Sequence, residues 1–283
     1  MTNFAKEEFN NSLIFEYNMI QDIPDLLKNY LAFCDYLNET KKSNSFNPKT
    51  CSCIYPTTFL PLIVFKVHEY PINVSNCEDR VINYVRFMFD NIGKKIVSTK
   101  SYLPPTILPK EENLRKDVLE NLYQTHNDGV EYCGMDSFCY LINELVDNIY
   151  DHSKFSNAGV MVQKYKSNGF TEICICDNGV TIPGSFNNNE ILFKDDCDAI
   201  KKAINGRSSR SEERGFGLNT NLRLFTTGLN GKMLIVSRNG AYYSEKKTKR
   251  LYNLPEIYSL RGTLISVRIP YPCQGVDIYE FIK

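Results

Sequence analysis

A short polar stretch in the middle of the chain combines side chains that can do chemistry together. Glu144, Asn148 and Asp151 follow one another at helical spacing, so in a helix they project from one polar stripe. Leu145 and Ile149 fall on another side, which is typical of an amphipathic helix. A carboxylate can polarise a water molecule, and a neutral carboxamide oxygen can bind Mg²⁺. The stretch is therefore a candidate wall of a polar ligand site.

Three further blocks with chemical potential follow this stretch along the chain. Residues 177–183 (Asp-Asn-Gly-Val-Thr-Ile-Pro) come directly after a strand-like run. Residues 214–219 (Arg-Gly-Phe-Gly-Leu-Asn) form a glycine-rich turn that opens a helix. Residues 261–270 begin with Arg-Gly-Thr and continue as a strand near the end of the chain. Each block stands at the edge of an element that could hold its polar groups in place.

Each of these blocks favours a particular contact. The Asp177 carboxylate, held at a strand end, can accept a hydrogen bond from an exocyclic amine and disfavours a carbonyl at that place. Gly179 allows the backbone to approach a planar base without a Cβ. Gly215 and Gly217 leave backbone N–H groups free at a helix N-terminus, which suits an anionic phosphate. Together these contacts suit a purine nucleotide.

The order of the four blocks resembles the N, G1, G2 and G3 boxes of the GHKL ATPases, which include gyrase B, the histidine kinases, MutL and the anti-sigma serine kinases. The resemblance covers residues 134–272 and implies the Bergerat ATP-binding fold with ATP and Mg²⁺ as cofactors. It implies Glu144 as the general base and Asn148 as the magnesium ligand. Arg214 and residues 191–213 would form a mobile lid over the phosphates. The residues that it implies for nucleotide binding are Asn148, Asp151, His152, Asp177, Gly179, Ile182, Arg214, Gly215, Phe216, Gly217, Leu218 and Thr263. Of these, Thr263 would join Asp177 around the adenine through a bound water.

Each block has a simpler interpretation when it is taken alone. A polar stripe on an amphipathic helix is usually its solvated side, and Asp-Asn-Gly is an ordinary turn sequence. His152 can support the site without reacting. The agreement of four blocks in the right order is what favours the nucleotide site.

The first 110 residues are predicted to form a small α/β domain. Helices are expected at 23–31, from Pro56 onwards and at 78–91, with strands at 51–55 and 72–74 and a polar loop at 40–49. The order resembles a STAS-like module, which implies binding to a protein partner or self-association through this half. Three prolines within residues 101–110 indicate a linker, so the predicted domains are 1–110 and 111–283.

The second half is predicted to be a two-layer α/β sandwich. Its sheet is expected to be mixed and mostly antiparallel, with helices on one face. Residues 159–165 and 172–176 show the alternating pattern of strands and are predicted to form an antiparallel pair joined by Ser167-Asn168-Gly169. Residues 232–237 and 263–269 are predicted to be further strands. The basic run at 245–250 is expected to be a solvated loop.

Composition excludes several classes of function. Lys and Arg number 33, as do Asp and Glu, so no net charge attracts nucleic acid or an anionic membrane. No apolar run approaches the roughly 18 residues of a membrane span, and no secretory signal is evident. The ten cysteines lack metal-ligand spacing, since Cys51/Cys53 and Cys174/Cys176 are C-x-C pairs in strand-like runs. Free thiols fit a cytoplasmic protein.

Three functions remain open for such a site. The first is Mg²⁺-dependent ATP hydrolysis or ATP-switched regulation with Glu144 as the base. The second is a serine/threonine protein kinase of the anti-sigma type that acts on a STAS-like partner. The third is a nucleotide-binding interaction module without turnover.

Overall fold

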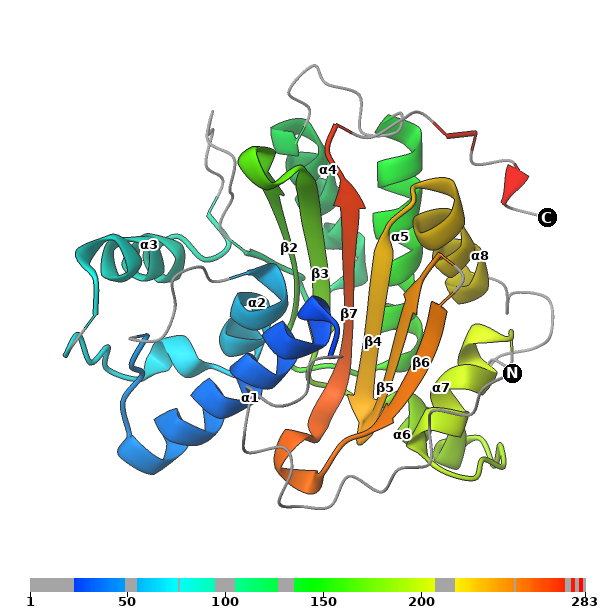
Figure 1. Cartoon of the computed structure of the whole chain (residues 1–283), viewed down its shortest axis with the longest axis horizontal. Helices are drawn as coiled ribbons and strands as arrows, with labels where there is room; N and C mark the ends of the chain where they lie inside the picture. Colours follow the sequence, from blue (N-terminus) through cyan, green and yellow to red (C-terminus); the bar gives the residue numbers. More distant parts are fainter. Residues whose placement is uncertain are drawn as a thin grey trace.

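The strands that the structure describes form one seven-stranded sheet, and the last of them along the chain lies in its middle (Figure 1). The computed structural model describes residues 23–48, 55–75, 77–94, 105–126, 135–206, 217–246, 248–272, 276–277 and 280–281. The strands are β1 (Thr106–Ile107), β2 (Ala158–Tyr165), β3 (Phe170–Asp177), β4 (Lys232–Arg238), β5 (Gly240–Glu245), β6 (Thr248–Asn253) and β7 (Leu260–Pro270). Their order is β1-β2-β3-β7-β4-β5-β6, and all neighbouring pairs are antiparallel, where the sequence predicted a mixed sheet.

Helices cover both faces of this sheet. The helices are α1 (Asp25–Ser43), α2 (Pro56–Val64), α3 (Asp79–Asp90), α4 (Arg115–His126), α5 (Met135–His152), α6 (Ile182–Asn188), α7 (Asp196–Ile204) and α8 (Gly217–Arg223), which continues into a π-helical turn at Leu224–Gly228. Short 3₁₀ turns lie at Val67–Glu69, Glu112–Leu114, Lys166–Asn168 and Glu256–Tyr258. Figure 1 shows α1 and α2 in front of the sheet and α5 behind it.

The alternation of side chains along the strands divides the interior into two cores. In β3, Ile173 and Ile175 join the core shared with α5, α7 and α8, whereas Cys174 and Cys176 join the core shared with α1 and α2. Both faces of β3 are therefore apolar, as expected of a strand covered on both sides. The prediction that the C-x-C pair of β3 shares one face is confirmed, while Cys51 and Cys53 lie outside the described residues.

The first part of the chain differs from the predicted small α/β domain. The described residues 23–94 contain helices and one isolated parallel bridge between Phe46 and Ile72, in place of the strand predicted at 72–74. Their core is continuous with strands β3, β4, β5 and β7. Helix α1 runs to Ser43, beyond the predicted start of the loop, and ends where Asn44 takes a left-handed conformation. The helices use their apolar faces to cover the sheet, so the predicted boundary at residue 110 does not separate two cores.

The second half follows the prediction more closely, with three corrections. The β2–β3 pair, β4, β7 and the helix that carries Glu144, Asn148 and Asp151 are confirmed. The predicted linker contains β1, which pairs with β2 at the sheet edge. The basic run belongs partly to β6, whose pairing with β5 was not predicted. Helices of this half lie on one face as predicted, and α1 and α2 of the first part cover the other face, so the described fold has three layers where the second half alone was predicted to have two.

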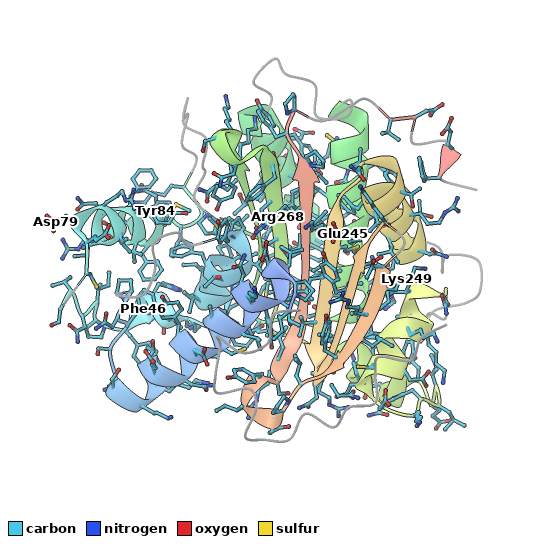
Figure 2. The ribbon with its side chains drawn as sticks, viewed as in Figure 1. Phe46, Asp79, Tyr84, Glu245, Lys249 and Arg268 are labelled. Carbon is cyan, nitrogen blue, oxygen red and sulfur yellow. The ribbon has the colours of Figure 1, made fainter. Side chains whose placement is uncertain are left out.

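A buried ion pair holds the front helical layer on the sheet. One carboxylate oxygen of Glu172 accepts hydrogen bonds from the Thr57 backbone N–H (3.0 Å) and hydroxyl (2.6 Å) at the start of α2. The other oxygen accepts from Arg268 Nε (3.1 Å) and Nη2 (2.7 Å). The Arg268 guanidinium also lies 4.1 Å from the ring centroid of Phe170, and Figure 2 labels Arg268 above α2. Glu172 is fully buried, so each of its partners offsets the cost of removing its charge from water.

In the ranges that the structure describes, no helix is both long enough and apolar enough to cross a membrane.

Candidate functional site

Three polar side chains lie side by side where three neighbouring strands meet the loops. The register pairs Asp177 of β3 with Thr263 of β7, and Thr263 with Ser237 of β4. The alternation along each strand puts all three on the face covered by α5, since Ile175, Ile265 and Ile235, two residues away from them, belong to that core. The blocks that carry Asp177 and Thr263 are thus adjacent in space, although they are far apart in sequence.

The Asp177 carboxyl is almost completely buried. Burial raises its pKa to about 7, while hydrogen bonds from the backbone N–H groups of Gly179 and Thr263 oppose that rise. The bond from Gly179 to Asp177 Oδ1 is 2.8 Å long. The buried Ser153 hydroxyl also lies close enough to lower this pKa, but it makes no hydrogen bond of good geometry with any described residue. A buried carboxyl beside such a hydroxyl is suited to a polar ligand group or a water.

The loop after β3 is joined to the end of α5. The Val180 N–H donates to the carbonyl of Ser153, the first residue after α5. Asn178 Oδ1 accepts from the backbone N–H groups of Ser156 (3.1 Å) and Asn157 (2.8 Å). These bonds fix the polar helix of the first block against the aspartate of the second.

Two glycines allow this close approach. A Cβ on Gly179 would overlap the Ser153 carbonyl, so the structure accounts for this glycine by backbone packing, where the sequence predicted approach to a base. Gly262 has φ +145° and a Cβ there would overlap the Asp177 carbonyl. The role of Gly262 was not predicted, although a glycine inside a strand pattern signals such a contact.

The polar stripe of α5 has the predicted orientation. Leu145 and Ile149 are buried, Glu144 and Asn148 are half-buried, and Asp151 is exposed. The Asn148 side-chain nitrogen donates to the Glu144 carbonyl (2.8 Å), a bond that does not use the carboxamide oxygen. At 1.5 Å of rise per residue, Asn148 lies about 8 Å and Glu144 about 14 Å along the helix from Ser153. An elongated ligand held at Asp177 would pass Asn148 before Glu144.

An ion pair beside Glu144 was not predicted. Arg115 Nη1 lies 2.6 Å from Asp147 Oδ1, and its guanidinium lies 5.3 Å from the ring centroid of Tyr150. Burial raises the pKa of Glu144, and the charge of Asp147 raises it further. Burial also raises the pKa of Asp147, against the effect of Arg115. A carboxylate with a raised pKa is a better proton acceptor, as a general base requires.

The remaining predicted residues lie around these elements. Ile182 begins α6 and its N–H donates to Ser237 Oγ (2.9 Å). His152 is the last residue of α5. Gly217 and Leu218 begin α8, which packs against α5. Arg214, Gly215 and Phe216 lie outside the described residues, so the glycine-rich turn stays a prediction.

The predicted mobile lid needs correction. Residues 196–204 of that segment form α7, whose Ala199 and Ile200 are fully buried in the core under the sheet. Asp196 pairs with Arg238 (3.2 Å) and accepts from the Asn239 N–H (3.1 Å). The apolar residues within 196–204 pack into the core, so this stretch is part of the helical layer and not of a lid. Residues 207–213 lie outside the described part of the chain.

The described side chains around α5 could supply a ligand to Mg²⁺, but not a complete metal site. Across the described residues, no group of three His, Cys, Asp or Glu side chains could hold a metal ion. Mg²⁺ commonly takes one or two protein oxygens and completes its shell with waters and phosphate oxygens of a bound nucleotide. The Asn148 oxygen on the polar stripe fits that pattern.

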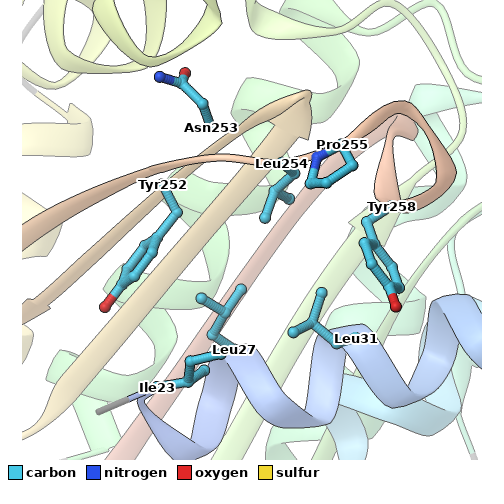
Figure 3. Close-up of a pocket in the computed structure, with 8 residues that line it drawn as sticks. All are labelled: Ile23, Leu27, Leu31, Tyr252, Asn253, Leu254, Pro255 and Tyr258. Atoms are coloured by element: carbon cyan, nitrogen blue, oxygen red, sulfur yellow. The ribbon is translucent and has the colours of Figure 1, made fainter. Parts of the chain in front are cut away.

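An apolar pocket lies on the other side of the sheet (Figure 3). It is bounded by Leu27 and Leu31 of α1 and by Tyr252, Leu254 and Tyr258. These α1 residues belong to the core opposite α5, so the pocket is separate from Asp177. It contributes nothing to the candidate site.

No protein-family model and no curated protein matches this chain.

The buried state of Asp177 predicts a specific dependence of stability on pH. The native carboxyl keeps its proton up to about pH 7, whereas the same carboxyl loses its proton near pH 4 in the unfolded chain. The native state therefore binds more protons between these values, and Asp177 lowers stability as pH rises through that window. The difference in unfolding free energy between wild type and Asp177→Asn is expected to fall by up to about 1.4 kcal/mol per pH unit from pH 5 to 7.

Urea unfolding of both proteins at several pH values between 5 and 8 measures this difference. Other titrating groups cancel because both proteins contain them. A difference that stays constant, or that rises with pH, would show that the carboxyl is already ionised in the folded protein.

Proposed function

We propose that this chain binds ATP with Mg²⁺ as a member of the GHKL class with a Bergerat fold, and that it hydrolyses the nucleotide. The observation that carries the proposal is the pairing of buried Asp177 with Thr263 on adjacent strands, beside the end of the polar helix α5. This arrangement brings three of the four blocks of the sequence to one place.

Recognition of the base is assigned to the strand ends. An ionised Asp177 offers a lone pair to an exocyclic amine, and the amine in turn would favour the ionised form of this carboxyl. Thr263 is half-buried beside it, and the side chains of Asp177, Thr263 and Ser153 together form the polar edge of the site. A purine with a carbonyl at the same position would place two acceptors against each other, which disfavours guanine.

The phosphates are assigned to the stripe of α5. With the base at Asp177, the chain of phosphates would extend along the helix past Asn148 towards Glu144. Asn148 would hold Mg²⁺ through its amide oxygen, and the ion would neutralise charge on the phosphates. Glu144, with its raised pKa, would take a proton from the attacking water. Asp151 and His152 would support the helix end.

Water is the proposed acceptor of the phosphate because a half-buried carboxylate at Glu144 suits activation of a small nucleophile. The described residues before β1 use their apolar faces to cover the sheet. A protein partner or a second copy would therefore have to bind other surfaces of this half.

Incubation with γ-labelled ATP and Mg²⁺ distinguishes the possible reactions. Release of free phosphate is expected, and it should be lost in Glu144→Ala. Label transferred to protein instead would indicate a kinase, and bound nucleotide without either product would indicate a binding module without turnover.

Asp177→Asn is expected to weaken ATP binding by about 1–3 kcal/mol, because the amide group cannot accept at both positions of a buried carboxylate. Isothermal titration calorimetry at pH 8 measures the affinity. Asp198→Asn is the matched control, since Asp198 pairs with Lys202 (2.7 Å) on the surface of α7. Equal ATP affinity in wild type and Asp177→Asn would refute the assignment of the base.

A further inference from the structure

The hydroxyl of Ser237 joins three separate parts of the candidate site. Ser237 is fully buried at the end of β4. Its oxygen accepts from the Ile182 N–H (2.9 Å), its proton is directed to the Gly262 carbonyl (3.0 Å), and the Thr263 hydroxyl lies 3.1 Å away. This one oxygen thus links the start of α6, the glycine of β7 and the hydroxyl of Thr263.

The number of protons and lone pairs on each group sets the direction of these bonds. A serine hydroxyl has one proton and two lone pairs. Ile182 N–H can only donate, so it takes one lone pair of Ser237. The Gly262 carbonyl can only accept, so it takes the proton. The remaining lone pair of Ser237 must then receive the proton of Thr263.

The consequence concerns the face that Thr263 presents to a ligand. Because its proton points to Ser237, the half-buried Thr263 oxygen offers only lone pairs on its other side. Asp177, its partner across the strands, is also an acceptor when ionised. At a pH where Asp177 is ionised, the polar edge of the site therefore requires hydrogen-bond donors from whatever occupies it.

We infer that Ser237 is a positioning residue that fixes the Thr263 hydroxyl as an acceptor, so that the site selects purine nucleotides with an amino group over those with a carbonyl. This inference rests on the proposed nucleotide site and adds a determinant of its selectivity. Loss of the Ser237 hydroxyl would free the Thr263 proton, which could then be donated to a carbonyl.

The test compares ATP with inosine triphosphate, which has a carbonyl in place of the 6-amino group. Affinities of the full chain for both nucleotides with Mg²⁺ are measured by calorimetry for wild type, Ser237→Ala and Ser237→Thr. In Ser237→Ala the preference for ATP is expected to fall by about 3- to 10-fold, the effect of one hydrogen bond. Ser237→Thr keeps a hydroxyl and should keep the wild-type preference. Ser244→Ala, a buried serine on β5, is the matched control and should also keep it.

A merely structural role for Ser237 has a different signature. If Ser237→Ala weakens both nucleotides equally, the preference is unchanged and the inference is wrong, although the nucleotide site stands. If wild type binds neither nucleotide, both the site and the inference are wrong. Thr263→Val offers a second route should Ser237→Ala not fold: it removes the acceptor itself, so a folded Thr263→Val with an unchanged preference would also overturn the inference.

Discussion

Glu144→Gln is expected to lower the rate of ATP hydrolysis by about 10²- to 10⁴-fold, while ATP still binds. The substitution keeps the size of the side chain but removes its ability to accept a proton from water. Affinity for ATP should be equal or higher, because a negative charge near the proposed phosphate path is lost. Phosphate release under saturating ATP measures the rate, and calorimetry measures the affinity.

A matched control separates the role of Glu144 from a general effect of charge. Glu120 lies on α4 with an exposed carboxylate that pairs only loosely with Lys116 (3.8 Å). Glu120→Gln should hydrolyse ATP at the wild-type rate. Hydrolysis by Glu144→Gln at that same rate would exclude Glu144 as the base, even if the nucleotide binds where we propose.

Glu172→Ala is expected to lower the unfolding free energy by about 3–5 kcal/mol. The reason is that Arg268 is almost buried and would lose both hydrogen bonds to its carboxylate partner, while the Thr57 N–H at the start of α2 would lose its acceptor. For a chain of this size the melting temperature should fall by about 10 °C. Thermal unfolding followed by circular dichroism measures the change.

Two companion variants sharpen this prediction. Glu69→Ala breaks an exposed ion pair with Lys66 (2.9 Å) and should cost less than about 1 kcal/mol. The double variant Glu172→Leu with Arg268→Met removes both buried charges and should recover most of the lost stability. A loss for Glu172→Ala as small as that for Glu69→Ala would mean that α2 is held on the sheet by apolar packing alone.

Local pattern predicts much of the second half of the chain. The alternation in β2 and β3 and the apolar spacing of α5 are properties of contiguous residues, and each of these elements forms where it was expected. The β5–β6 hairpin was missed because its charged residues, such as Lys249 and Arg250, suggest a loop when their pairing partners are unknown. An edge strand can carry charged side chains and still pair with its one neighbouring strand.

The meeting of Asp177, Thr263 and Ser237 depends on contacts between residues that are far apart in sequence. Nothing local indicates that the last strand enters the sheet between β3 and β4. The four blocks predicted Asp177 and Thr263 through a resemblance, but Ser237 ends an ordinary apolar strand and carries no signal by itself. Its significance follows from strand register alone. In the same way, the helices of the first part could be predicted, but not the face of the sheet that they cover.

The most direct test of the nucleotide site is a crystal structure of the full chain with a non-hydrolysable ATP analogue and Mg²⁺. We expect the amino group of the base within about 3 Å of an Asp177 carboxylate oxygen, and the phosphates beside Asn148 and Glu144 on α5. A base bound elsewhere, such as in the apolar pocket beside α1, or an Asp177 carboxyl that contacts no part of the nucleotide, would contradict the proposed site.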